Sequence, residues 1–132
     1  MTGTSGSTRQ VNEGAVTLMV PGRPEFLRLV RLAAADAGTR AELSIDDVED
    51  LRIAVDELTY ALLGEEPSNE ILTLTYTAAP GVVEIEGSFP TTGSAVEVSE
   101  LSQSIIAAVV DTHEVVDDGV ARRFRFSKRS RP

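Results

Sequence analysis

Residues 44–64, SIDDVEDLRIAVDELTYALLG, carry the clearest helical pattern in the sequence and decide the fold. Ser44 is a typical N-cap residue, and Asp47 stands three positions later, as in a capping box. Gly64 is typical of the residue that follows a helix. The apolar side chains recur in steps of three and four residues: Val48, Leu51, Val55, Leu58 and Leu62. We therefore expect a helix whose apolar face packs against another layer of the protein.

Two further elements are expected before this helix. Residues 15–20 alternate between two sets of side chains, which indicates a strand. The segment 21–38, PGRPEFLRLVRLAAADAG, places Pro24 where it suits the first turn of a helix. Its core-facing residues recur at helical spacing: Leu27, Val30, Ala34 and Ala37. Gly38 is expected to end this helix.

The rest of the chain predicts four more strands and one more helix. The expected order is strands at 72–77 and 83–86, a loop at 87–94, a helix at 98–111, and strands at 112–116 and 120–127. Between the last two strands, Asp118-Gly119 favours a tight hairpin. The order β-α-α-β-β-α-β-β predicts an α+β fold, a two-layer sandwich with a mostly antiparallel sheet and helices on one face.

The composition excludes several classes of protein. A chain of 132 residues is sized for one domain, which we expect over 15–128, after a disordered leader at 1–14 and before a basic tail at 129–132. The sequence has no cysteine, and the single histidine, His113, leaves little for a zinc site or a serine-type triad. No apolar run approaches the ~20 residues that cross a bilayer. Because the leader lacks a signal-peptide pattern, we expect a cytoplasmic protein.

The charge of the chain is uneven. The net charge is −9, and residues 1–121 combine all 21 acidic residues with only six of the 12 basic ones. An acidic body repels phosphates and anionic lipid, so we expect neither nucleic acid nor a membrane as partner. It would attract a basic protein surface. The basic C-terminal end is interpreted as a solvated strand with a frayed end, in preference to a nucleic-acid patch.

The first two helices also carry a family pattern. It consists of Pro24, Glu25, Phe26 and Arg31 in the first helix and Asp50, Leu51, Ala54, Val55 and Glu57 in the second. With this pattern and with the expected order of strands and helices, the chain resembles the anti-sigma-factor serine kinases of bacterial stress and sporulation switches. These proteins are histidine-kinase-like ATPases with the Bergerat fold. The resemblance implies a sigma factor and an anti-anti-sigma factor as partners, ATP and Mg²⁺ as cofactors, and a homodimer.

The catalytic motif of that family is incomplete in this chain. Active members carry a glutamate and, four residues later, an asparagine, so that a carboxylate and a metal-ligating amide lie one turn apart on the same face of the helix. Glu57 occupies the glutamate position, but Ala61 stands where the asparagine would be. Glu57 is therefore interpreted as a vestigial base or as a solvated residue beside the apolar face. No metal ligand is expected.

The nucleotide motif is incomplete as well. The family has an Asp-x-Gly-x-Gly turn and then a glycine-rich lid whose backbone amides wrap the phosphates. Residues 84–89 contain one glycine, Gly87, and no aspartate, and the following loop contains only Gly93. Gly87 is interpreted either as a remnant of the phosphate turn or as a residue that relieves crowding at a strand end. We expect no bound cofactor.

The outer face of the first helix is a candidate partner surface. Projection at 100° per residue places Glu25, Arg28 and Leu32 opposite the core, with Arg31 on the shoulder. An exposed leucine beside charges of both signs can accept a partner, although single exposed leucines are common. The family resemblance favours the partner surface.

Three functions are therefore open. The favoured hypothesis is an anti-sigma factor that sequesters a sigma factor and takes part in partner switching, with ATP binding and kinase activity weak or lost. The second is a Mg-ATP-dependent serine kinase that phosphorylates an anti-anti-sigma factor, with Glu57 as base. The third is a non-catalytic dimerising scaffold, since fold alone does not dictate function.

Overall fold

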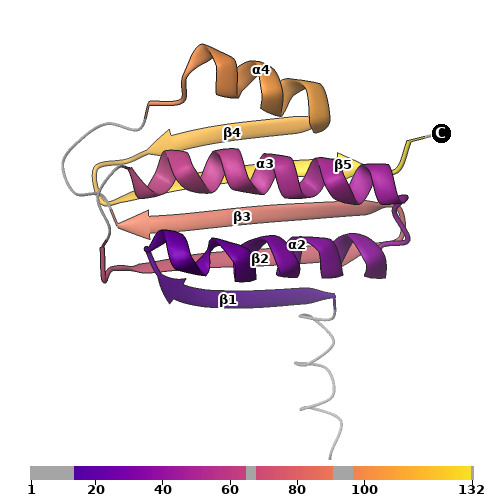
Figure 1. Ribbon diagram of the computed structural model, residues 1–132, viewed down its shortest axis with the longest axis horizontal. Helices are drawn as coiled ribbons and strands as arrows, with labels where there is room; N and C mark the ends of the chain where they lie inside the picture. Colours follow the sequence, from indigo (N-terminus) through magenta and orange to yellow (C-terminus); the bar gives the residue numbers. More distant parts are fainter. Residues whose placement is uncertain (1–13, 65–67, 91–96, 132) are drawn as a thin grey trace, which may run out of the picture.

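The computed structural model describes residues 14–64, 68–90 and 97–131. The described elements, in chain order, are β1 (Ala15–Pro21), the short 3-10 turn η1 (Pro24–Phe26), α2 (Leu27–Arg40), α3 (Ile45–Leu63), β2 (Ile71–Ala79), β3 (Val82–Pro90), α4 (Glu100–Val109), β4 (Thr112–Asp117) and β5 (Ala121–Arg129). Figure 1 shows them along the chain. The expected leader, at 1–14, lies almost entirely outside the described residues.

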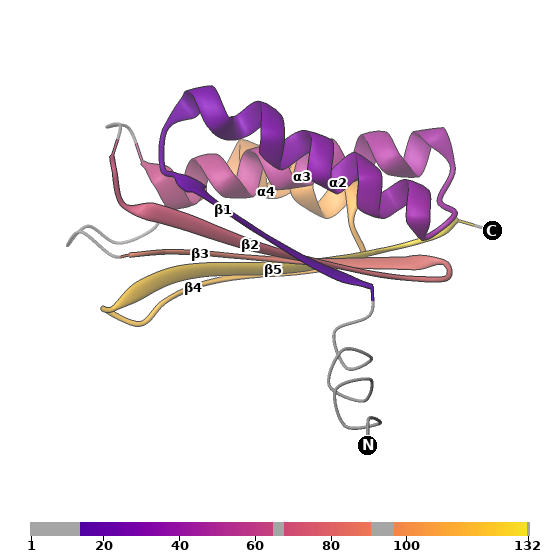
Figure 2. The same cartoon turned by 90° about the horizontal axis from the view of Figure 1, so that it is seen from below.

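These elements form an α+β sandwich of two layers. The five strands make one sheet in the order β1-β2-β3-β5-β4, and every neighbouring pair is antiparallel. All of α2, α3 and α4 lie on the same face of the sheet (Figure 2). No helix of the described residues covers the other face, which we call the uncovered face. The expected fold class is confirmed. None of the helices in the described segments is long and apolar enough to cross a membrane.

Local signals set the helix boundaries. The Ser44 side chain accepts a hydrogen bond from the Asp47 backbone N–H at 3.1 Å, so the expected cap of α3 is present. Gly64 follows α3 with a φ of 73°, as expected for a helix C-terminus. The expected end of α2 at Gly38 is wrong, because this helix continues to Arg40. A Cβ at Gly38 would lie 2.8 Å from Val48 Cγ2, so the glycine allows α2 and α3 to approach closely.

The core lies between the helices and the sheet. The inward faces of β2, β3 and β5 contribute Leu74, Tyr76, Ile85 and Phe126, all fully buried. The Tyr76 hydroxyl donates to the Val30 carbonyl of α2 at 3.0 Å, which satisfies the one polar atom of this side chain inside the core. Burial also raises the pKa of Tyr76, so the hydroxyl stays a donor at neutral pH.

Gly87 lies inside a strand and not in a loop. The loop expected at 87–94 is corrected by β3, which continues to Pro90 and pairs Gly87 with Phe124 of β5. A Cβ at Gly87 would lie 2.3 Å from Phe124 Cε2, so the glycine makes room for an aromatic ring of the core. The expectation that Gly87 relieves crowding is supported. The other lid glycine, Gly93, lies outside the described residues.

The C-terminal end is anchored, whereas a solvated end was expected. Lys128 is 5% exposed, and its Nζ lies 3.0 Å from Asp50 Oδ2 and 3.6 Å from Asp47 Oδ1. Arg131 pairs with the same two carboxylates, and its backbone N–H donates to Asp47 Oδ2 at 3.2 Å. Together, Asp47, Asp50, Lys128 and Arg131 form a charge cluster that fixes β5 to the first turns of α3.

The uncovered face of the sheet is polar, as expected from its threonines and glutamates. Glu84 is exposed, and Glu86 makes a 2.6 Å ion pair with Arg125 on the neighbouring strand. Ion pairs at exposed sites contribute little stability. This face therefore tolerates water without needing a covering layer.

Candidate functional site

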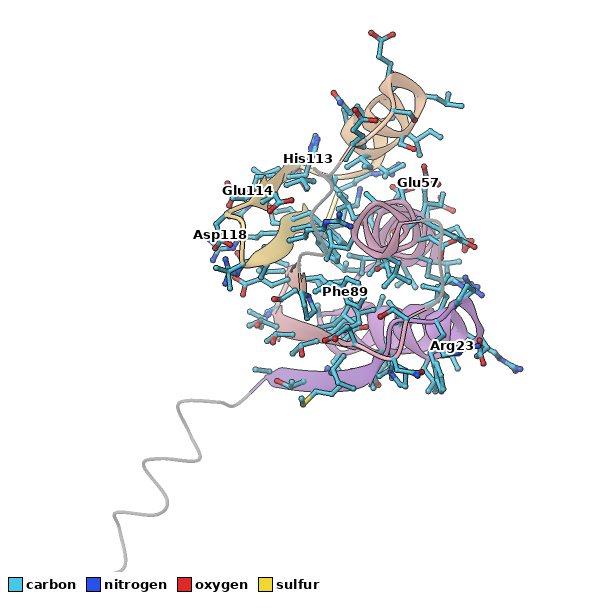
Figure 3. All side chains as sticks on the ribbon, turned by 90° about the vertical axis from the view of Figure 1, so that its left-hand side faces the viewer. Arg23, Glu57, Phe89, His113, Glu114 and Asp118 are labelled. Carbon is cyan, nitrogen blue, oxygen red and sulfur yellow. The ribbon has the colours of Figure 1, made fainter. Side chains whose placement is uncertain are left out.

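A depression lies between α3 and the N-terminal end of α4. It has a volume of about 340 Å³ and is lined by Glu57, Tyr60, Ala61, Glu97, Val98, Ser99 and Ser102. Three of these residues come from α3, and the others come from α4 and the residues just before it. Figure 3 shows Glu57 on the side of α3 that faces α4. We call this feature the α3–α4 depression.

Glu57 is held by a contact from the opposite helix. The Ser102 hydroxyl of α4 donates a hydrogen bond to Glu57 Oε1 at 2.7 Å, and the pair is partly buried. A hydroxyl at this distance is within reach of proton transfer to a carboxylate, which is the geometry that a general base needs. Here the hydroxyl belongs to the protein itself.

The residues of the α3–α4 depression do not fit Mg²⁺ and a triphosphate. Ala61, one turn after Glu57, has no side-chain oxygen to offer a metal. Among the described residues that line the depression, two carry carboxylates, Glu57 and Glu97, and none is a lysine or arginine that could bind phosphate. Within the described residues, no group of three or more His, Asp or Glu side chains could hold a metal ion.

Gly87 does not belong to the depression. It lies in the middle of β3 and lines a different hollow, of about 200 Å³, on the uncovered face of the sheet. The structure therefore does not bring Glu57 and Gly87 to one hollow. His113 is an exposed residue of β4, which agrees with the small role expected for it.

The candidate partner residues divide into two groups. Arg28 and Leu32 are exposed, with Leu32 at 55%, and Glu25 is exposed in η1 and pairs with Arg23 at 3.3 Å. Arg31 differs, because it makes a 2.9 Å ion pair with Asp56 that joins α2 to α3. The exposed partner surface on the described chain is thus Glu25, Arg28 and Leu32, with Arg31 at its edge.

Five of the seven lining residues were not predicted as site residues from the sequence, and three of these five bear on the chemistry of the depression. Ser102 lies 45 residues from Glu57, and no local pattern connects the two. Glu97 lies at the end of the expected lid, and Tyr60 lies next to Ala61 but turned away from the apolar face. Tyr60 is 53% exposed, which its position opposite the core could have indicated.

Comparisons with known proteins identify relatives of this chain. No family model matches it. The anti-sigma-F factor RsbW of Mycobacterium tuberculosis H37Rv is 32% identical over 112 residues, which are 84% of this chain and 67% of the relative. The serine-protein kinases RsbW of Listeria monocytogenes serovar 1/2a and Listeria innocua are each 39% identical over 56 residues, which are 39% of this chain.

The matches to the Listeria kinases span only 36% of the length of those proteins, whereas the mycobacterial match spans two thirds of its relative. The longer match extends over most of the sandwich, including the helix pair that carries the family pattern. With this identity over most of its length and with the expected architecture, the chain belongs to the anti-sigma-factor serine kinase family.

Proposed function

We propose that this protein is an anti-sigma factor that sequesters a sigma factor by surface complementarity, without hydrolysing or requiring ATP. The observation that carries the proposal is the lining of the α3–α4 depression, in which Ala61 offers no metal ligand and Glu57 already accepts a hydrogen bond from Ser102. Membership of the family supports the sigma-factor partner. An anti-anti-sigma factor would release the sigma factor by competing for the same protein.

The binding surface in this proposal is the outer side of η1 and α2. It presents an apolar side chain, Leu32, flanked by Arg28 and Glu25, and all three are exposed. The acidic body of the protein, with a net charge of −9, would speed the approach of a basic partner surface. A few such anchors carry most of the energy of a protein interface.

Replacing both Arg28 and Leu32 with glutamate tests this surface. We expect the variant to bind the cognate sigma factor at least about tenfold more weakly, because it removes an apolar anchor and reverses a charge. Both side chains are exposed, so the melting temperature should change little. Each sigma factor of the source genome is first assayed with the unaltered protein by calorimetry, and the one that binds is used for the variant.

The matched control makes the same chemical changes elsewhere. Arg129 and Val120 are both exposed, and replacing them with glutamate reverses the same charge and removes the same kind of side chain. This control should bind as the unaltered protein does. Equal affinity of both double variants would place the interface elsewhere, and no binding by any sigma factor would refute the proposed function.

One observation favours a second function. Glu57 lies 2.7 Å from a hydroxyl, which is the geometry of a general base, and the Listeria relatives carry the name serine-protein kinase. A Mg-ATP-dependent serine kinase is therefore the alternative. It requires that nucleotide binds despite the lining of the α3–α4 depression, which a titration of the full chain with ATP and Mg²⁺ tests.

A further inference from the structure

The α3–α4 depression has the chemistry of a cation site. Glu57 uses Oε1 to accept from Ser102, and no donor from the described residues reaches its second oxygen. Glu97 is exposed and makes no hydrogen bond or ion pair with any described residue. The depression therefore contains carboxylate oxygens that accept no hydrogen bond from the described residues and that can bind solvent or a ligand. A ligand with negative charge would be repelled from this position.

An aromatic ring lies beside these carboxylates. Tyr60 is 53% exposed and lines the depression together with Glu57 and Glu97. A cation over the face of a tyrosine ring is attracted by the ring quadrupole, most often when the cation is a guanidinium. A guanidinium also donates to carboxylates through a planar fork of N–H groups. Ala61 leaves the adjacent position free of a long side chain.

We propose that the α3–α4 depression binds the guanidinium group of an arginine on the sigma factor, at the position where the resemblance would place the nucleotide. The proposal rests on the proposed function. The arginine would pair with Glu57 and Glu97 and stack on Tyr60. In this account, Ser102 is a positioning residue, because its hydrogen bond fixes the orientation of the Glu57 carboxylate.

Geometry favours a side chain of a docked protein over a free small molecule. The helices α2, α3 and α4 all lie on one face of the sheet (Figure 2), and the α2 surface and the depression both belong to this helical layer. One partner can therefore contact both. The depression is open to solvent and holds about 340 Å³, near the lower end of the volumes of enclosed ligand pockets, which suits the end of one side chain.

The test uses the full chain and the sigma factor that binds it. Glu57→Gln and Glu97→Gln are combined, because glutamine keeps the size of each side chain and an oxygen that can still accept from Ser102. We expect about tenfold weaker binding and a shallower dependence of affinity on salt, since two charges are removed from the interface. Tyr60→Leu should weaken binding roughly threefold. Glu84→Gln, an exposed acid on the opposite face of the sheet, is the control and should leave the affinity unchanged.

The outcomes separate this inference from the proposed function. If the sigma factor binds and the Glu57→Gln/Glu97→Gln variant binds within twofold of the unaltered protein, the inference is wrong and the proposed function stands. If Mg-ATP displaces the sigma factor from the unaltered protein, the depression is a nucleotide site and the inference is overturned. If no sigma factor binds at all, both fail together.

Discussion

Replacing Lys128 with methionine should destabilise the protein by about 3 kcal/mol, because it leaves two carboxylates in the interior without their buried cation. The side chains of Lys128, Asp47 and Asp50 are 6%, 1% and 13% exposed. Arg131 remains beside both acids, but its side chain is 55% exposed and gives less compensation. Chemical denaturation of the variant and of the unaltered protein measures the difference.

Two controls identify the cause. Arg125→Met breaks an ion pair whose side chains are about half exposed, so it should change stability by less than about 1 kcal/mol. Combining Lys128→Met with Asp47→Asn and Asp50→Asn removes all three buried charges and should recover most of the loss. A triple variant as unstable as Lys128→Met would show that the lysine acts through packing alone.

The loss caused by Lys128→Met should depend on pH. Burial opposes ionisation of Asp47, but hydrogen bonds from Arg131 and Ser44 and the charges of Lys128 and Arg131 outweigh it and lower the pKa of Asp47 below 3.8. A lowered pKa in the folded state adds stability that is present above the unfolded value and is lost as the pH falls through the folded value. The difference between the two proteins should therefore be greatest at neutral pH and shrink below about pH 4.

Gly87→Ala should destabilise the protein by about 2 to 3 kcal/mol, because the new methyl group has no space. A Cβ at this position would meet the Phe124 ring at 2.3, 2.6 and 2.9 Å, and the ring is itself 2% exposed and held in the core. Thermal or chemical unfolding checks the size of the effect. The result also distinguishes the two interpretations of Gly87. If this glycine were only a remnant of a phosphate turn, Gly87→Ala would change ligand binding and leave the stability of the fold unchanged.

Controls for Gly87→Ala come from its neighbours. Ser88→Ala changes the next residue of β3, which points to the other face of the sheet, and should have little effect. Adding Phe124→Leu to Gly87→Ala shortens the opposing side chain and should restore part of the stability. Full stability of Gly87→Ala alone would contradict the packing role of this glycine.

The parts of the fold that depend on neighbouring residues could be predicted from the sequence. The cap of α3 at Ser44 needs only Asp47, three residues away. The turn between β4 and β5 is equally local, because Asp118 accepts hydrogen bonds from the backbone N–H groups of Val120 and Ala121 at 2.9 Å. The bonds from Ala121 and Val120, together with Arg123, lower the pKa of Asp118 to about 2.

The errors arose where distant residues decide the outcome. Gly38 and Gly87 have the same local signature as glycines that end helices and strands, but at each position a side chain of another element, Val48 or Phe124, leaves no room for a Cβ. Lys128 looked like part of a solvated basic end because its partners, Asp47 and Asp50, are 81 and 78 residues away. Only the folded structure brings these charges together.

The candidate site was predictable only where its residues lie close together in the sequence. Glu57 and Ala61 lie on one helix, so their spacing revealed that a second oxygen ligand is missing. The rest of the α3–α4 depression depends on the placement of α4 beside α3 in the tertiary structure. Its second carboxylate, Glu97, and the Ser102 hydroxyl therefore became visible only in the structure.

The central claim, that this protein works by binding and not by nucleotide chemistry, is tested most directly by titrating the full chain with ATP and Mg²⁺ in a thermal-shift assay, with Mg²⁺ alone as the reference. We predict no stabilisation at millimolar nucleotide, because the described lining of the depression supplies two carboxylates and no phosphate-binding cation. A ligand that binds the folded protein stabilises it by about 2.7 kcal/mol at a hundredfold excess over its Kd. A shift of that size, absent with Mg²⁺ alone, would contradict the account.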